Sequence, residues 1–223
     1  MKFFVLVLSF LISVSANAEL FPGRRDRAIP RQVALASQVI QHRMASPYSI
    51  PPFITDQAQC VAALRVVKVG FIWGGEGSTG LVSCRTQAGW STPSFFNVGG
   101  VNFGLQIGVQ FMESVLVFLT DYGRQILSRP TFKVGTDLSF AAGPAGQGGG
   151  NGLIPSAHVL TYDNAAGLYA GVTINGFVLA HAPVRNQHVY QQNIAPTVLL
   201  TTPGSYAPPV VRPFVDTMNY YIK

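Results

Sequence analysis

The segment that decides the fold runs from Val69 to Gln110 and reads VGFIWGGEGSTGLVSCRTQAGWSTPSFFNVGGVNFGLQIGVQ. Its last part, from Phe103 to Gln110, alternates strictly between apolar residues and glycine or glutamine. This two-residue period is that of a β-strand, and glycine along one face of a strand usually marks curvature or a close backbone approach. The segment therefore predicts a curled antiparallel sheet.

A glycine-rich stretch earlier in the segment, between two apolar runs, is interpreted as a hairpin loop. Within it, Gly75-x-Gly77-x-x-Gly80 matches the dinucleotide-binding pattern. That pattern requires a helix directly after the glycines. The residues that follow, Leu81 to Cys84, are β-prone instead, which disfavours a nucleotide site. Gly74, Gly75, Gly77 and Gly80 are therefore assigned a structural role.

Six short pieces of the chain occur in a fixed order. They are Lys68-x-Gly70-Phe71, the glycine-rich stretch, Gly89-Trp90-Ser91-x-Pro93, Gly104-Leu105-Gln106-Ile107-Gly108, Gly143-Pro144-x-Gly146 and Gly167-Leu168-Tyr169-Ala170-Gly171-Val172. In this order they resemble the SYLF domain, a lipid-binding family of bacteria and of eukaryotic membrane-trafficking and actin-patch proteins. The resemblance covers residues 50–190. It implies structural roles for Trp90, Ser91, Pro93, Gly143 and Pro144 and a lipid-facing position for Lys68, whereas Glu76 and Gln147 stand where many members carry basic residues.

The first 18 residues have the pattern of a secretory signal peptide. Lys2 supplies a positive charge, residues 3–14 are apolar, and Ala16-Asn17-Ala18 is typical of a cleavage site. The sequence therefore predicts a mature chain that begins near Glu19 and is exported to the periplasm or the cell envelope.

Residues 19–49 form a basic arm. From Glu19 to Arg43 the chain holds five arginines against two acidic residues, a net charge of +3. Between Pro30 and Pro47 a helix is expected, since Ile29, Val33, Ala36, Ile40 and Met44 form one apolar stripe. Two interpretations stay open: a surface helix docked on the sheet, or an interfacial helix that inserts its stripe among anionic lipid headgroups. The lipid-binding candidates are Arg24, Arg25, Arg27, Arg31, Arg43 and, through the resemblance, Lys68.

The remaining chain predicts further strands and two or three short helices in an α+β fold, a curled sheet or partial barrel. Strands are expected at 60–73, 113–120 and 132–140, with a helix at 122–128 capped by Asp121, and Asn175-Gly176 predicts a hairpin turn. Cys60 and Cys84 are expected to be buried thiols, because pairing across the glycine loop would place Cys84 opposite a residue near Gly70. A disulfide, made possible by export, is the alternative.

The C-terminal residues 191–223 contain five prolines and little periodicity. They predict an extended tail, which could bind a groove on a partner protein.

No catalytic, metal-binding or cofactor-binding arrangement is recognisable in the sequence. The four histidines are scattered, and acidic residues number only nine. A nucleic-acid partner is disfavoured because no basic and aromatic stripe is present. We therefore expect a non-enzymatic protein that binds anionic phospholipid or a membrane surface in the cell envelope. The alternatives are an envelope scaffold that binds a protein partner through the Pro-rich tail, and an outer-membrane-type β-barrel.

Overall fold

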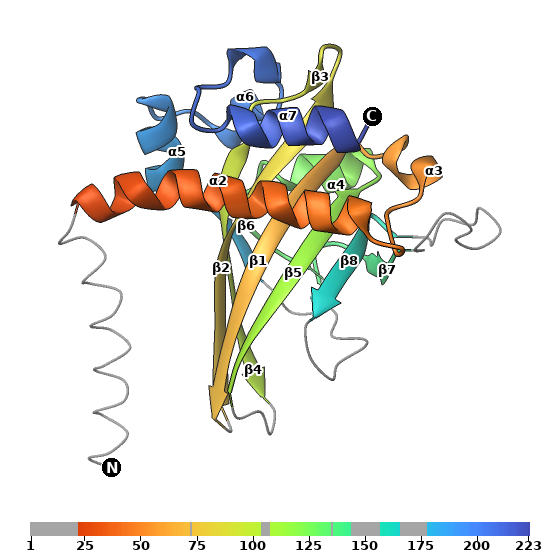
Figure 1. Ribbon diagram of the computed structural model, residues 1–223, viewed down its shortest axis with the longest axis vertical. Helices are drawn as coiled ribbons and strands as arrows, with labels where there is room; N and C mark the ends of the chain where they lie inside the picture. Colours follow the sequence, from red (N-terminus) through yellow and green to blue (C-terminus); the bar gives the residue numbers. More distant parts are fainter. Residues whose placement is uncertain (1–21, 72, 104–107, 135, 144–156, 166–177) are drawn as a thin grey trace.

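The computed structural model describes residues 22–71, 73–103, 108–134, 136–143, 157–165 and 178–223 (Figure 1). The predicted signal peptide at 1–18, Pro144 with most of the glycine-rich loop after it, and the Asn175-Gly176 hairpin lie outside these residues.

The strands form one curled sheet of nine strands with the order β6-β9-β4-β2-β1-β5-β8-β7, and β3 pairs with β2. The long central strands are β1 (Cys60–Phe71), β2 (Trp73–Thr86), β4 (Ser94–Phe103) and β5 (Gly108–Phe118). The shorter strands are β3 (Gly89–Trp90), β6 (Thr131–Lys133), β7 (Phe140–Ala142), β8 (Val159–Ala165) and β9 (Val178–His181). Neighbours are antiparallel except β7 and β8, which are parallel. The predicted curled, mostly antiparallel α+β fold is confirmed.

More helix is present than the two or three short helices expected. The described helices are α2 (Pro22–Ala45), α3 (Pro52–Thr55), α4 (Asp121–Ile126), α5 (Pro183–Tyr190), α6 (Pro196–Leu199), the 3-10 turn η1 (Gly204–Tyr206) and α7 (Arg212–Tyr221). Helix α2 has 24 residues and contains Pro30 in its interior. The expected start at Pro30 was wrong. The missing N–H of Pro30 removes one helical hydrogen bond but does not end this helix.

The glycine-rich stretch is part of strand β2, so the predicted hairpin loop is wrong. The chain reverses between Phe71 and Trp73, which pair with each other, and the register continues without a break to Cys60 opposite Cys84. Glycine permits this pairing because it lets the two backbones approach closely. At Gly80 an added Cβ would lie 2.8 Å from the carbonyl oxygen of Ala63 and against the side chain of Leu64.

The same register explains a disulfide between Cys60 and Cys84. The two Cα atoms lie 3.9 Å apart on neighbouring strands, and both residues are fully buried. The expectation of two free thiols was wrong because it placed the turn inside the glycine-rich stretch rather than before it.

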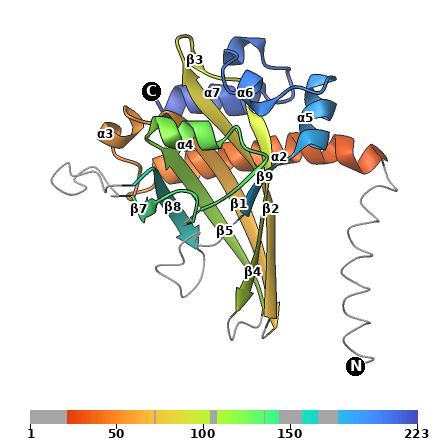
Figure 2. The ribbon, with the colours of Figure 1, turned by 180° about the vertical axis from the view of Figure 1, so that it is seen from behind.

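Both faces of the upper sheet are buried. On the face that we call the outer face, Val61, Ala63, Leu81, Phe95 and Val117 belong to a core with residues of α2 and α7, and Figure 1 shows these helices across the strands. On the opposite, inner face, Ala62, Leu64, Phe118 and Phe132 belong to a second core with residues of α4, which Figure 2 shows from behind. Burial on both sides accounts for the continuous apolar run that begins β1.

The C-terminal segment is folded, and its prediction as an extended tail is wrong. Phe214 and Met218 of α7 and Val211 before it are fully buried in the outer core. Prolines stand in the first turns of α5, α6 and α7, where the missing N–H costs nothing and the fixed φ suits a helix. The prolines therefore begin helices here.

Two local predictions also shift. Helix α4 is capped by Thr120, whose hydroxyl accepts a hydrogen bond from the Gly123 amide at 3.0 Å, and Asp121 is its first residue. The strand expected over 132–140 is divided into β6 and β7. Among the described helices, none has the length and apolar character needed to cross a membrane.

Candidate functional site

Helix α2 has one buried side and one exposed side, as its sequence predicts. Ile29, Val33, Ala36 and Ile40 are at most 4% exposed and pack in the outer core. The exposed side carries residues that include Arg31, Gln38 and His42. This matches the docked-helix interpretation. The apolar stripe is therefore not available for insertion into a membrane, and only the polar side can meet a partner.

The predicted cations of the arm divide into three groups. Arg31 is exposed on α2. Arg24, Arg25 and Arg27 lie in the first turns of α2, and their side chains are outside the described part of the structure. Arg43 is different, because its side chain turns toward the sheet.

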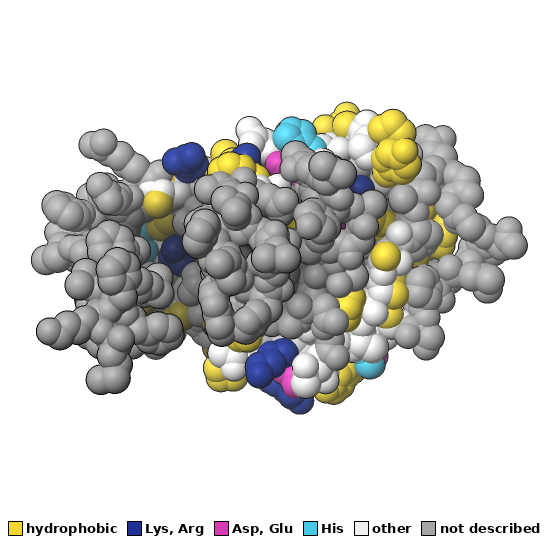
Figure 3. Space-filling view, turned by 90° about the horizontal axis from the view of Figure 1, so that it is seen from below, with side chains coloured by type: hydrophobic (Ala, Val, Ile, Leu, Met, Phe, Trp, Pro, Cys, Tyr) yellow, Lys and Arg dark blue, Asp and Glu magenta, His cyan; other side chains and the backbone are white. Residues whose placement is uncertain are grey.

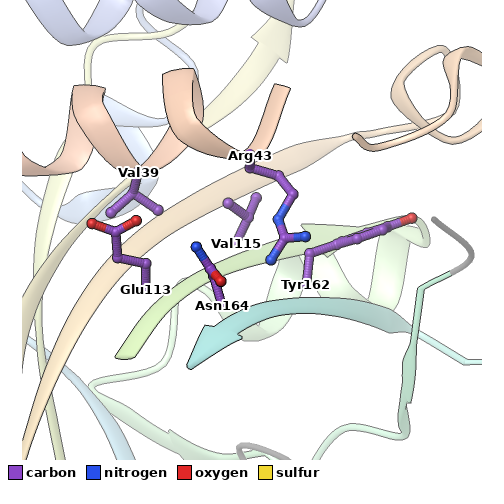
Figure 4. Close-up of a pocket in the computed structure, with 6 residues that line it drawn as sticks. All are labelled: Val39, Arg43, Glu113, Val115, Tyr162 and Asn164. Carbon is purple, nitrogen blue, oxygen red and sulfur yellow. The ribbon is translucent and has the colours of Figure 1, made fainter. Parts of the chain in front are cut away.

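Arg43 lies in a small polar cluster between α2 and the outer face of β5 and β8 (Figure 4). Its guanidinium donates a hydrogen bond to the carbonyl of Tyr48 at 3.3 Å and lies 6.0 Å from the centre of the Tyr162 ring. Burial lowers the pKa of Arg43, and nearby Asp163, Tyr162 and Glu113 oppose that effect. Burial also raises the pKa of the Tyr162 hydroxyl, and this effect outweighs the lowering by the positive charge of Arg43.

This cluster is too small to hold a headgroup. The cavity that Val39, Arg43, Glu113, Val115, Tyr162 and Asn164 line has a volume of about 10 Å³, which is the space of about one water molecule. Next to it, His42 Nδ1 lies 3.1 Å from a carboxylate oxygen of Glu113. His42 therefore joins the end of α2 to β5, and Arg43 lies against Tyr162 of β8. Arg43 follows the buried Val39 by four residues, and residues at this spacing lie on the same face of a helix. This spacing indicates that Arg43 lies at the border of the docked side.

Figure 3 looks along the strands from the lower end of the molecule, and the Lys and Arg side chains visible there lie at several separate places. Lys68 lies in β1 opposite Glu76 and Gln110. The alternation of β1 places it on the inner face, and its side chain is outside the described part.

The Trp90-Ser91-x-Pro93 corner has structural partners. Ser91 is fully buried, and its hydroxyl accepts a hydrogen bond from the Cys84 amide at 3.0 Å. Trp90 donates its indole N–H to the carbonyl of Ile222 at 2.7 Å, and the Arg85 guanidinium lies 4.9 Å from its ring centre. Because the Ser91 hydroxyl is fully enclosed, a substrate could not reach it in this conformation.

Arg85 also lines an open depression of about 640 Å³ with Arg124 and the turn after β2, which sequence reasoning missed. The guanidinium of Arg85 donates to the carbonyls of Ala58, Thr55 and Lys223 at 2.6–3.1 Å. Its donors are thus committed to joining β2 to α3 and the C-terminus. Within the described ranges, no three His, Cys, Asp or Glu side chains are grouped so that they could hold a metal ion.

Residues 99–221, more than half of the chain, match the family described as "Ysc84: Las17-binding protein actin regulator". The chain belongs to this family. The Ysc84 family is the one that the resemblance to the SYLF domain indicated, and the match continues through α7, past the limit of 190 drawn from the sequence.

Three relatives show how far the similarity extends. An SH3 domain-containing protein of Schizosaccharomyces pombe is 32% identical over 197 residues, covering 85% of this chain and 43% of that protein. Human SH3 domain-containing YSC84-like protein 1 is 32% identical over 149 residues, covering 65% and 44%. LAS seventeen-binding protein 3 of Saccharomyces cerevisiae is 28% identical over 195 residues, covering 85% and 39%. The chain spans less than half the length of these relatives. No solved structure matches it significantly.

Proposed function

We propose that this chain is a non-enzymatic, exported member of the Ysc84 family that binds anionic phospholipid at a membrane surface of the cell envelope. The observation that carries the proposal is the arrangement of α2. The helix docks through its apolar stripe and keeps Arg31 exposed, and the same helix begins with Arg24, Arg25 and Arg27. The lipid binding implied by the SYLF resemblance supports this assignment.

The mechanism is electrostatic attraction to the headgroups. An arginine near an anionic membrane surface contributes about 1 kcal/mol, and the attraction decays within a Debye length of about 8 Å at physiological salt. Because α2 is already docked on the sheet, the helix itself does not have to be ordered during binding. Binding should therefore weaken steeply as salt is added.

Sedimentation with vesicles tests this function. Replacing Arg24, Arg25 and Arg27 together with glutamine should lower the partition coefficient on anionic vesicles on the order of 100-fold at low salt, from about 1 kcal/mol for each charge. The matched control removes three cations from other elements, Arg129, Lys133 and Lys223, and should change binding little. Equal losses in both variants would show that net charge, rather than α2, governs binding.

The proposed export rests on the signal-peptide pattern and is supported by the Cys60–Cys84 disulfide, since disulfides persist in oxidising compartments. Sequencing the N-terminus of the protein from its native cell should find Glu19 or a neighbouring residue first. A cell-associated chain that retains Met1 would contradict export.

A second candidate function is binding of a protein partner. Three large apolar residues are exposed on the C-terminal elements: Val198 at 52%, Tyr206 at 77% and Tyr220 at 71%. The family description speaks of Las17 binding, and the name of the Saccharomyces cerevisiae relative says the same of that protein. Replacing Tyr206 and Tyr220 with serine should leave vesicle binding unchanged, and reduced vesicle binding in this variant would argue against two separate surfaces.

A further inference from the structure

The four central strands continue well past α2, and their far ends form an amphipathic sheet. In Figures 1 and 2, β1, β2, β4 and β5 extend below α2, beyond the described helices. From Arg65 to Phe71, β1 advances six residues, or about 20 Å at the rise of a strand. The pairing of β1 with β2 and β5, and of β2 with β4, keeps one register over this length. The faces of the upper sheet can therefore be followed to its end.

At this end the register assigns apolar residues to outer-face positions, on the side on which α2 lies, and among their side chains only that of Phe111 is in the described part of the structure. Val61 and Ala63 belong to the outer core, so alternation places Val67, Val69 and Phe71 of β1 on the same face. Residues paired across strands share a face, so the partners of these residues on β2 and β5, and in turn the β4 partners of those β2 residues, also belong to the outer face. We call the following set the strand-end patch: Val67, Val69, Phe71, Trp73, Val101, Phe103, Val109 and Phe111.

The inner face of the same strand ends has the opposite composition. Its register positions hold Lys68, Gly70, Glu76, Asn102 and Gln110, together with further glycines. A sheet with one free side normally turns its polar residues outward. Here the outer-face register positions hold the apolar residues, and helices α2 and α7 lie above this part of the strands in Figures 1 and 2.

Described side chains at the upper border of the patch support an open surface. Phe111 is 52% exposed, and the guanidinium of Arg65 lies 5.7 Å from its ring centre. A Cβ added to Gly99 would meet no atom within 4 Å. An aromatic ring with a cation beside it, at the edge of an apolar surface, is the arrangement found where proteins meet the boundary between headgroups and acyl chains.

We propose that the strand-end patch inserts into the headgroup and acyl boundary of the membrane, and that Arg65 and Phe111 mark the level of the headgroups. The occupant is a lipid bilayer because no charged residue falls among the eight patch positions and because α2, with its cations, lies on the same side of the sheet. This inference rests on the proposed function and supplies the apolar contact that the docked stripe of α2 cannot make.

The two tryptophans of the chain allow a direct test. Trp73 is in the patch, whereas Trp90 is 1% exposed and hydrogen-bonded to Ile222. The mature chain is mixed with phosphatidylglycerol and phosphatidylcholine vesicles that carry doxyl-labelled lipid. We expect the doxyl groups to quench the tryptophan emission of the bound protein, and Trp73→Phe to remove that quenching while the variant still sediments.

Two matched double variants test the contact without relying on fluorescence. The variant Val69→Ser with Phe103→Ser changes the patch. The control, Asn102→Ser with Gln110→Ser, changes neighbouring positions on the inner face. At about 1 M salt, where the Debye length is about 3 Å, the patch variant should lose about tenfold or more in vesicle partition and the control little. Thermal unfolding checks that both variants fold.

The outcomes separate this inference from the proposed function. If the wild-type chain sediments with vesicles but its emission is not quenched, the membrane contact lies elsewhere and the inference is overturned while the function stands. If the wild-type chain does not sediment at low salt, the proposed function fails and the inference fails with it. If the patch substitutions convert an oligomer to a monomer and leave vesicle binding intact, a second copy covers the patch and the inference is again overturned.

Discussion

At the scale of single residues, Arg31 and Arg43 show how one helix gives two arginines different roles. Arg31 is exposed, whereas Arg43 is partly buried beside Tyr162 and donates to the Tyr48 carbonyl. Arg43→Gln should therefore lower the free energy of unfolding by about 1–2 kcal/mol, the scale of a lost hydrogen bond from a charged group. Urea unfolding measures this loss. Vesicle binding should stay within twofold of the wild type.

Arg31→Gln is the matched comparison. It should leave the free energy of unfolding within about 0.5 kcal/mol, as is usual for surface positions, and should weaken binding to anionic vesicles. The reverse result, with Arg43 important for binding and Arg31 for stability, would contradict the roles assigned from their burial.

His181 gives the fold a component of acid sensitivity. Its ring lies 4.3 Å from that of Phe96, and burial lowers the pKa of His181, outweighing the opposite effect of the carbonyls of Leu127 and Arg129. The unfolded chain therefore binds the proton more tightly than the folded chain. This contribution is fully present above the unfolded pKa of about 6.5 and is lost as the pH falls below it.

The variant His181→Phe keeps an aromatic ring beside Phe96 and removes the titrating group. Relative to its own value at pH 8, its free energy of unfolding should fall less than that of the wild type between pH 7 and pH 5. Parallel curves for the two proteins would show that protonation of His181 does not affect folding.

Sequence reasoning at this scale identified the buried stripe of α2, since a 3.6-residue period is a local property. It could not assign Arg43, because the direction of a long side chain at the border of a stripe depends on what the sheet places beside it. Tyr162 and Glu113, which are far from Arg43 in the sequence, decide that direction.

At the scale of elements, the β1–β2 hairpin is defined by its register and by the disulfide. The Cys60–Cys84 bond closes a loop with a sequence separation of 24, for which loop-closure entropy predicts a stabilisation of about 3 kcal/mol. The double variant Cys60→Ala and Cys84→Ala should lose about that amount in urea unfolding and keep its fold. Wild-type protein measured with a reductant should approach the variant, and an identical midpoint with and without reductant would contradict the bond.

Helix α7 is the second element on which the fold depends. Phe214 is fully buried and Tyr220 of the same helix is 71% exposed. Phe214→Ala should cost about 3–5 kcal/mol, as expected for a large core side chain, and Tyr220→Ala should be nearly neutral. Similar midpoints in urea for the two variants would mean that α7 is not part of the core.

Element types were easier to predict than their connections. The apolar run near Val61 is local and lies in strand β1. The alternating run 103–110 does not form one strand, because β4 ends at Phe103 and β5 begins at Gly108, and residues 104–107 lie outside the described part of the chain. The position of the turn before Trp73 was missed because glycines usually mark loops, whereas here they let two strands approach. Helix α7 was not predicted, because the five prolines of this segment indicated an extended chain. Its apolar residues are buried by contact with α2 and β3, which are far from it in the sequence.

At the scale of the whole molecule, the two features of the proposed membrane contact belong to one side of the sheet. Helix α2 crosses the upper outer face, and the strands whose register positions form the strand-end patch extend below it (Figure 1). The fold class could be read from the sequence, and so could the family through its ordered motifs. That these two segments share a side follows only from the register, which no local pattern contains.

The measurement that tests this account most directly is the affinity of the mature chain for phosphatidylglycerol-containing and pure phosphatidylcholine vesicles as salt is raised. The account predicts strong binding to the anionic vesicles at low salt and a steep decrease as the Debye length shortens from about 30 Å at 0.01 M to about 8 Å at 0.15 M. It also predicts a smaller decrease in the variant that lacks Arg24, Arg25 and Arg27. Equal affinity for both kinds of vesicle, or no binding to anionic vesicles at low salt, would contradict it.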